Sequence, residues 1–218
     1  MILLLLIALV PVLFVLIVSE MLWRKKVVKG ERARKFIHIL AGAWMAFWPL
    51  YLPFKAVAVL GCVALVILLY SRITTLFHAI YAVKRRTYGD LLFAIAIIVC
   101  ALAAREPWIF TVSILLLALA DGGAAVVGRF YGISNQYVVL GVKNLRKSVA
   151  GTLAFIVFAY VSIAVGALIG GSEIVQQNMF VALLILPFGA ACIENITPFG
   201  LDNLVTPLFA TLLLNTLL

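Results

Sequence analysis

Three acidic residues stand beside stretches that are otherwise apolar, and their chemistry is the most informative feature of this chain. Asp121 lies inside one apolar run, Glu194 closes another, and Asp202 opens a third. A carboxylate at membrane depth is costly, so it is usually retained for ion, proton or phosphate chemistry. Pro198 and Gly200 break the helical pattern between the last two acids, which predicts that Glu194 and Asp202 fold back toward a common point. Oxygen ligands of this kind suit Mg²⁺, which often bridges to phosphates.

A first basic segment, ERARKFIHILAG, begins at Glu31 and carries Arg34, Lys35 and His38. On a helix, Arg34, His38 and Gly42 lie on one face because they are four residues apart. Such a face offers positive charge to a phosphate, and Gly42 lets another helix approach closely. The alternative interpretation is a basic membrane anchor with a packed histidine.

A second segment, ADGGAAVVGRFYG, surrounds Asp121 with small residues. The small side chains allow a ligand or a neighbouring helix to come close to the backbone, and Arg129 is suited to bidentate contact with a phosphate. The alternative is a helix-packing interface in which one buried acid is paired with a neighbouring base. We favour the functional interpretation.

A third segment, KNLRKSVAG, places several groups that bind anions at the start of a predicted helix: Lys143, Arg146, Lys147 and Ser148. Side-chain charge and free backbone N–H groups together make an anion site there. The segment resembles a nucleotide-binding P-loop, but Arg146 occupies the position that needs a second glycine, and no strand precedes it. We therefore reject the P-loop, while a simple positive anchor at the membrane surface stays open. Asn203, next to Asp202, is a further polar contact for a phosphate.

The elements that must position these residues are membrane helices. The chain of 218 residues is 66% hydrophobic and 11% charged, and its mean hydropathy is +1.23. Apolar runs of roughly 15 to 20 residues are about the length that spans a bilayer core. We predict an all-α, polytopic membrane protein in which residues 1–218 form one unit, with seven or eight spans at approximately 2–20, 36–52, 56–71, 90–104, 108–127, 149–170, 178–195 and 203–218.

The net charge of +9 follows from membrane topology and does not indicate nucleic-acid binding. Fifteen of the 17 Lys and Arg residues fall in alternate loops, and only Lys55 and Arg105 fall on the other side. Basic loops face the cytoplasm, so this pattern predicts an external N-terminus. It also puts the acidic and basic clusters on the cytoplasmic side, where nucleotides are found.

Taken together, the motifs resemble the CTP-dependent polyprenol kinase family, which includes dolichol, phytol and CTP-dependent diacylglycerol kinases. The motifs are RKFIHILAG, ADGGAAVVGRFYG, KSVAGTLAF, and an acid followed by LDNLVTPL, in that order between Arg34 and Leu208. The resemblance implies transfer of the γ-phosphate of CTP to the hydroxyl of a membrane lipid alcohol, such as an isoprenoid. One departure is Ala125, where phytol-kinase-like members often carry a second acid, so Asp121 must work with Glu194 or Asp202.

For such a reaction we expect Asp121, Asp202 and Glu194 to hold Mg²⁺, with Asp121 taking the hydroxyl proton. The basic residues Arg129, Lys143, Arg146 and Lys147 would hold the triphosphate, supported by Ser148 and Asn203. Two alternatives stay open. A CTP-dependent lipid cytidylyltransferase uses the same kinds of residue, and a transporter of an anionic solute also explains acids that face bases. We favour the kinase.

Overall fold

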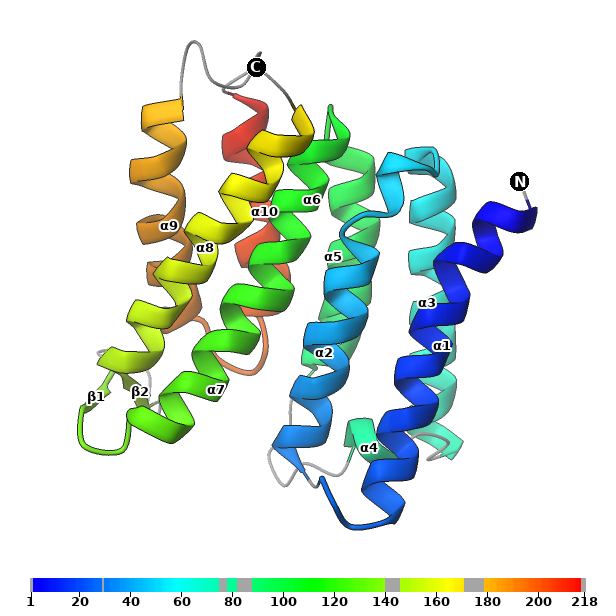
Figure 1. The fold of residues 1–218 in the computed structure, drawn as a ribbon, viewed down its shortest axis with the longest axis horizontal. Helices are drawn as coiled ribbons and strands as arrows, with labels where there is room; N and C mark the ends of the chain where they lie inside the picture. The colour runs from blue at the N-terminus through cyan, green and yellow to red at the C-terminus, as the bar shows by residue number, and fades with distance from the viewer. Residues whose placement is uncertain are drawn as a thin grey trace.

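The computed structural model shows a chain built almost entirely of helices (Figure 1). It describes residues 2–28, 30–74, 78–81, 88–139, 146–170 and 179–216. The longer helices are α1 (Ile2–Arg24), α2 (Glu31–Met45), α3 (Phe54–Thr74), α5 (Gly89–Ala103), α6 (Pro107–Leu115), α7 (Asp121–Tyr131), α8 (Val149–Gly170), α9 (Met179–Ile196) and α10 (Asp202–Asn215). The shorter elements are η1 (Trp48–Leu50), α4 (His78–Tyr81), the π-helix η2 (Leu116–Ala120), and the strands β1 (Gln136–Val138) and β2 (Arg146–Ser148).

Several of these helices have the length and composition of membrane spans. In the described part of the chain, four are long and apolar enough to cross a bilayer: α1, α3, α8, and the continuous helix that α6, η2 and α7 form over Pro107–Tyr131. Two shorter apolar helices cover Gly89–Ala103 and Ala182–Ile196. These findings confirm the all-α membrane class. Each of the eight predicted segments overlaps a helix, and the number that cross the bilayer stays a prediction.

The long helices run alternately up and down in Figure 1, so that elements distant in sequence meet at one end of the bundle. The lower end in that view holds the starts of α2, α8 and α10, the ends of α7 and α9, and the β1–β2 hairpin. All of the described residues that the sequence motifs singled out for phosphate or metal chemistry therefore lie at or near this end.

The helix Pro107–Tyr131 forms the centre of the bundle. Of its most apolar stretch 78% is buried, against 17% for α1 and 33% for α8. Phe110, Ile114 and Leu117 on this helix are among the most deeply buried side chains. Because neighbouring helices surround it, this helix can present side chains to several others at once.

The central helix contains a π-helical turn, η2, directly before Asp121. The backbone N–H of Asp121 bonds to the carbonyl of Leu116, five residues earlier, where an α-helix would bond four residues back. Single π-turns of this kind rotate the following residues and often occur at functional sites. The rotation sets which way Asp121 faces, and the hydropathy pattern gave no sign of it.

Close approach between α2 and the central helix depends on Gly42. A Cβ atom added there would lie 2.8 Å from the Cβ of Ala118 in η2. This agrees with the sequence interpretation that Gly42 lets another helix approach. The approach brings the basic face of α2 beside Asp121.

The loop between α7 and α8 contains a small hairpin that the sequence analysis did not predict. Strands β1 and β2 pair antiparallel, with Tyr137 opposite Lys147. Directly opposed residues share one face of an antiparallel pair. Tyr137 and Lys147 both reach α9, so this hairpin attaches the loop to the site. Its strands are too short to give a hydropathy signal in the sequence.

Candidate active site

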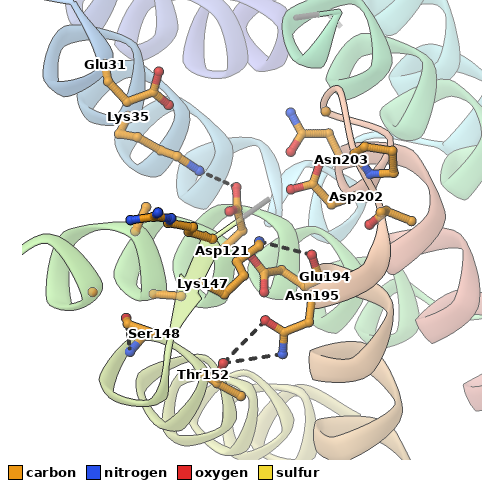
Figure 2. A pocket seen from close by; sticks show the side chains of 18 of the residues that line it. Glu31, Lys35, Asp121, Lys147, Ser148, Thr152, Glu194, Asn195, Asp202 and Asn203 are labelled. Atoms are coloured by element: carbon orange, nitrogen blue, oxygen red, sulfur yellow. Dashed lines mark hydrogen bonds and ion pairs between the residues drawn. The ribbon is translucent and has the colours of Figure 1, made fainter. Parts of the chain in front are cut away.

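A polar cavity of about 260 Å³ lies at the lower end of the bundle, among α2, α7, the hairpin, α8, α9 and α10. Figure 2 shows the side chains from these elements pointing toward one another. Four acids and four bases line it: Glu31, Asp121, Glu194, Asp202, Arg34, Lys35, Arg146 and Lys147. Charges of both signs in one enclosed space suit a ligand that combines a cation with a polyanion.

The three acids singled out in the sequence meet at this cavity. Asp121, Glu194 and Asp202 each present a carboxylate oxygen, and these oxygens lie within 4.8 Å of one another. Asp121 and Glu194 are buried, with exposed fractions of 7% and 6%. An arrangement of oxygen atoms at this spacing fits a divalent cation such as Mg²⁺. Their role as metal ligands stays a prediction.

The mutual repulsion of these acids is visible in Asp202, which precedes the apolar part of α10. Burial, and then the nearby carboxylate of Asp121, raise the pKa of Asp202 to about 6. Like charges that share a site oppose each other's ionisation. A cation between the three carboxylates would remove this opposition, which is a second reason why the residues present fit a metal.

A tight turn joins α9 to α10 and brings two of the acids together. Phe199 and Gly200 both have positive φ, at 58° and 88°. A non-glycine residue in this region is disfavoured, so the turn is held by its surroundings: the Tyr88 N–H donates to the Phe199 carbonyl at 3.3 Å. The chain reversal predicted from Pro198 and Gly200 is present, and it places Glu194 and Asp202 at one point.

Two lysines neutralise two of the acids. Lys35 Nζ on α2 donates to Asp121 Oδ2 at 2.5 Å, and Lys147 Nζ in β2 bonds to the Glu194 carboxylate and, at 3.0 Å, to its backbone carbonyl. Burial opposes the charge on Lys147, but the Glu194 carboxylate outweighs that effect and the pKa of Lys147 is raised. Lys147 therefore stays a cation in the site.

His38 lies on the inner side of the Asp121 carboxylate. Its Nε2–H donates to the carbonyl of Leu117 at 2.7 Å, and the same nitrogen is 3.2 Å from Asp121 Oδ2. Leu117 belongs to the π-helix, so its carbonyl is displaced from the regular helical pattern. His38 therefore fixes both the backbone before Asp121 and the orientation of the carboxylate.

Arg34 and Arg146 supply positive charge at the cavity walls. One terminal nitrogen of Arg34 bonds to Glu31, while its Nε is buried and has no hydrogen-bond partner among the described residues. Buried donors are normally paired, and an anion bound in the cavity would satisfy this one. Arg146 is exposed at the rim.

Ser148 and Asn203 already have structural partners within the protein. The Ser148 Oγ accepts the N–H of Gly151 at 3.1 Å, which caps the start of α8. The Asn203 amide donates to the Gly89 carbonyl at 2.7 Å and joins α10 to α5. Both line the cavity, and their predicted contact with a nucleotide stays a prediction.

The structure does not support one predicted phosphate contact. Arg129 is exposed and is not among the residues that line the cavity, whereas Asp121, Ala125 and Gly128 of the same helix are. Helical periodicity gives the reason: residues at i, i+4 and i+7 share the inward face, and the next residue turns away from it. Lys143, the other predicted contact in this region, lies outside the described residues.

Several site residues had no assigned role in the sequence analysis. Asn195 accepts a hydrogen bond from the Tyr137 hydroxyl at 2.9 Å, and Tyr137 and Thr152 are joined at 2.7 Å. This network ties β1, α8 and α9 together behind Lys147. Asn195 and Thr152 could have been found from the sequence, because Asn195 adjoins a candidate acid and Thr152 follows Ser148 by four residues. Tyr137 could not, because only the hairpin brings it to the site.

Gly132, at the end of α7, lies in close contact with Ser148 of strand β2. A Cβ at Gly132 would lie 2.5 Å from the Ser148 Cβ and 2.3 Å from its Oγ. We expect Gly132→Ala to destabilise the protein by about 1–3 kcal/mol, because neither backbone can move freely. The thermal unfolding midpoint in detergent should fall, while Ser134→Ala, on the exposed side of the same loop, should leave it unchanged. An unchanged midpoint for Gly132→Ala would contradict this packing.

The fold and the site together define a helical membrane protein with a polar cavity in which three carboxylates meet basic side chains. Comparison with known proteins finds similarity to two phytol kinases. The chain is 28% identical to the phytol kinase of Synechocystis sp. over 91% of its own length and 84% of that protein. It is 25% identical to the probable phytol kinase 2, chloroplastic, of Glycine max over 92% of its length and 70% of that protein. No family model and no solved structure matches.

These relatives confirm the resemblance predicted from the four motifs. Over most of its length the chain is similar to these two phytol kinases. The similarity extends over about nine-tenths of the chain.

Proposed function

We propose that this protein is a lipid alcohol kinase, which transfers the γ-phosphate of a nucleoside triphosphate, CTP, to the hydroxyl of an isoprenoid alcohol in the membrane. The observation that carries the proposal is the meeting of three carboxylates with Lys35 and Lys147 in one cavity. Phosphoryl transfer depends mainly on positioning and on neutralising charge, and the cavity supplies groups for both. The relatives named phytol kinases support the same class of reaction.

Asp121, Glu194 and Asp202 are the residues that would hold Mg²⁺, which would neutralise charge on the phosphate oxygens. Arg34, Arg146 and the two lysines surround the same space and would bind the remaining phosphate oxygens. Arg34 is preorganised for this because its buried Nε lacks a partner in the described residues. On binding, each lysine can keep its carboxylate and add a phosphate contact, since an ammonium has three donors.

The transfer itself forms one bond and breaks one. The alcohol oxygen attacks the γ-phosphorus, the bond from that phosphorus to the β-bridging oxygen breaks, and the nucleoside diphosphate leaves with the electron pair. The proton from the alcohol passes to Asp121, the acid that lies deepest along its membrane helix. Lys35 and His38 hold the Asp121 carboxylate in place, so that the accepting oxygen is aimed before the alcohol arrives.

The proposal also places the cavity at the cytoplasmic face of a multi-pass protein. Helix α1, which ends at Arg24, has its C-terminal end at the same end of the bundle as strand β2, which begins at Arg146 and lines the cavity (Figure 1). Basic residues favour the cytoplasmic side. Nucleoside triphosphates would then reach the site directly from solution, and the alcohol would reach it from the bilayer.

The test uses purified protein in nanodiscs with Mg²⁺, a panel of lipids, and CTP labelled at either the γ or the α phosphate. The panel contains phytol, geranylgeraniol, polyprenol, diacylglycerol and phosphatidate. We expect label from the γ position in a product derived from an isoprenoid alcohol. Label from the α position in a phosphatidate product would instead identify a cytidylyltransferase. If no lipid becomes labelled with CTP or with any other nucleotide, the kinase proposal is overturned and transport of an anionic solute is favoured.

A further inference from the structure

A second cavity, of about 190 Å³, lies beside the polar one and has a different character. Its walls are aliphatic and aromatic side chains from α1, α2, α3 and α5, such as Leu16, Met45 and Phe93. Helix α1 packs on α2 and α3 packs on α5 (Figure 1). Residues from both of these pairs line the cavity. It is therefore an apolar space inside the bundle, separate from the wall where the carboxylates meet.

The two cavities are neighbours that share part of their walls. Arg34, Lys35 and Asn203 line both of them. His38 lines the apolar cavity, and its Nε2 is 3.2 Å from Asp121 Oδ2. A molecule in the apolar space would thus have one end beside the carboxylate that the proposed function uses as the base.

The apolar cavity extends along one face of α2, through Lys35, His38, Ala41 and Met45. Ten residues of α-helix rise about 15 Å, which is half of a hydrocarbon core of roughly 30 Å. The buried side chain of Trp48 lines the cavity just beyond Met45. This depth corresponds to one leaflet of the bilayer.

The apolar cavity also has a side that is exposed on the surface of the bundle. Leu13 on α1 and Val63 and Ile67 on α3 line it, and each is close to half exposed, at 51%, 49% and 46%. Exposed apolar side chains on opposite rims are suited to contact with lipid chains. A tail can therefore enter sideways from the bilayer, without leaving the apolar phase.

We propose that this cavity is the binding site for the hydrocarbon tail of the substrate, a single-chain lipid alcohol whose hydroxyl lies between Lys35 and His38. The naming of an alcohol rests on the proposed function, and the tail site rests on the apolar walls and on the junction with the polar cavity. A cavity of about 190 Å³ offers limited room, so acceptors with a single isoprenoid tail are preferred to those with two acyl chains.

Ala64 on α3 lines the cavity and has room beside it, which makes it the position for a test. We expect Ala64→Phe to lower kcat/KM for geranylgeraniol by about tenfold or more, because the ring occupies space that the tail needs. The KM for CTP should stay within about twofold, and geraniol, a shorter isoprenoid alcohol, should be less affected. The matched control is Val66→Phe on the same helix, which is 64% exposed and does not line the cavity. Equal losses for both variants, or for both alcohols, would overturn the tail site.

A second measurement does not depend on turnover. A geranylgeraniol analogue with a diazirine at the tail end is photolysed in nanodiscs without nucleotide, and the labelled peptides are identified by mass spectrometry. We expect label near Met45 and Trp48 or on α1, competition by geranylgeraniol, and loss of label in Ala64→Phe but not in Val66→Phe. Label mainly on α8 or α9, or equal competition by the nanodisc phospholipid, would overturn the proposal. If the cavity is labelled while no alcohol is phosphorylated, the tail site stands and the proposed kinase activity falls.

Discussion

Replacing Asp121 with Asn is expected to lower turnover by about 10³-fold, the loss typical of removing a positioned proton acceptor. The amide keeps the size of the carboxylate, but it cannot take the alcohol proton and is a poorer ligand for a cation. It also removes the charge that Lys35 contacts at 2.5 Å. The measurement is phosphorylated alcohol formed per unit time, with γ-labelled CTP and saturating Mg²⁺.

The matched control for this substitution is Glu106→Gln, an exposed acid between α5 and α6, far along the chain from the cavity. Both variants should insert in the membrane and elute as the unmodified protein does in gel filtration. Wild-type turnover in Asp121→Asn would remove Asp121 from the mechanism. If Asp121→Asn aggregates, the double variant Lys35→Met/Asp121→Asn distinguishes loss of folding from loss of catalysis. It removes the ammonium that would be left unpaired, so it should fold and still be inactive.

The second large effect is expected for the divalent cation. Asp202→Asn should raise the Mg²⁺ concentration needed for half-maximal activity by at least about tenfold, because one of three carboxylate ligands is lost. Within the described residues no hydrogen bond or ion pair to the Asp202 side chain is found, so its replacement leaves no lysine without a partner. Burial and the charge of Asp121 raise the pKa of Asp202 to about 6, and a neutral amide also relieves that repulsion. Stability should therefore hold or rise.

Binding of Mn²⁺, followed by electron paramagnetic resonance, measures the cation site without turnover. The wild-type protein should bind Mn²⁺ with an affinity that falls in Asp202→Asn and in Glu194→Gln. Asp202→Glu keeps a carboxylate and should retain part of the affinity. Equal Mn²⁺ binding by the wild type and all three variants would show that these carboxylates do not hold the cation.

The two experiments also separate the roles of the acids. If Asp121 is the base and Asp202 is chiefly a ligand, excess Mg²⁺ should restore activity to Asp202→Asn and not to Asp121→Asn. Lys35 and His38 hold Asp121 from one side, whereas no side chain in the described part of the protein bonds to the Asp202 carboxylate at the start of α10. That asymmetry gives Asp121 the fixed geometry that proton transfer needs.

Much of the architecture could be predicted because it depends on local composition. A run of apolar residues as long as a bilayer core must be helical, since the backbone has to satisfy its own hydrogen bonds there. The residues around 2–20, 56–71, 108–127 and 149–170 met that condition and are helices in the structure. The turn at Pro198 and Gly200 was also local, and it could be predicted from two residues.

The residues of the site were harder to assign, because a residue's side of a helix depends on exact periodicity. Arg129 follows Gly128 by a single position, yet Gly128 lines the cavity and Arg129 is exposed. The π-turn of η2 shifts that periodicity just before Asp121, and nothing in the apolar composition of Leu116–Ala120 indicates it. The three-residue strands of the hairpin are likewise too short to have a hydropathy pattern.

By itself, then, the sequence determined that the chain is a helical membrane protein, which acids and bases it keeps near the membrane, and which family it resembles. Only the tertiary structure decided which acid meets which base: Lys35 with Asp121, and Lys147 with Glu194. It also decided that an apolar cavity borders the polar one. The physical reason is that composition and periodicity act over a few residues along one helix, whereas pairs separated by 86 and 47 residues form only where packed helices bring them together.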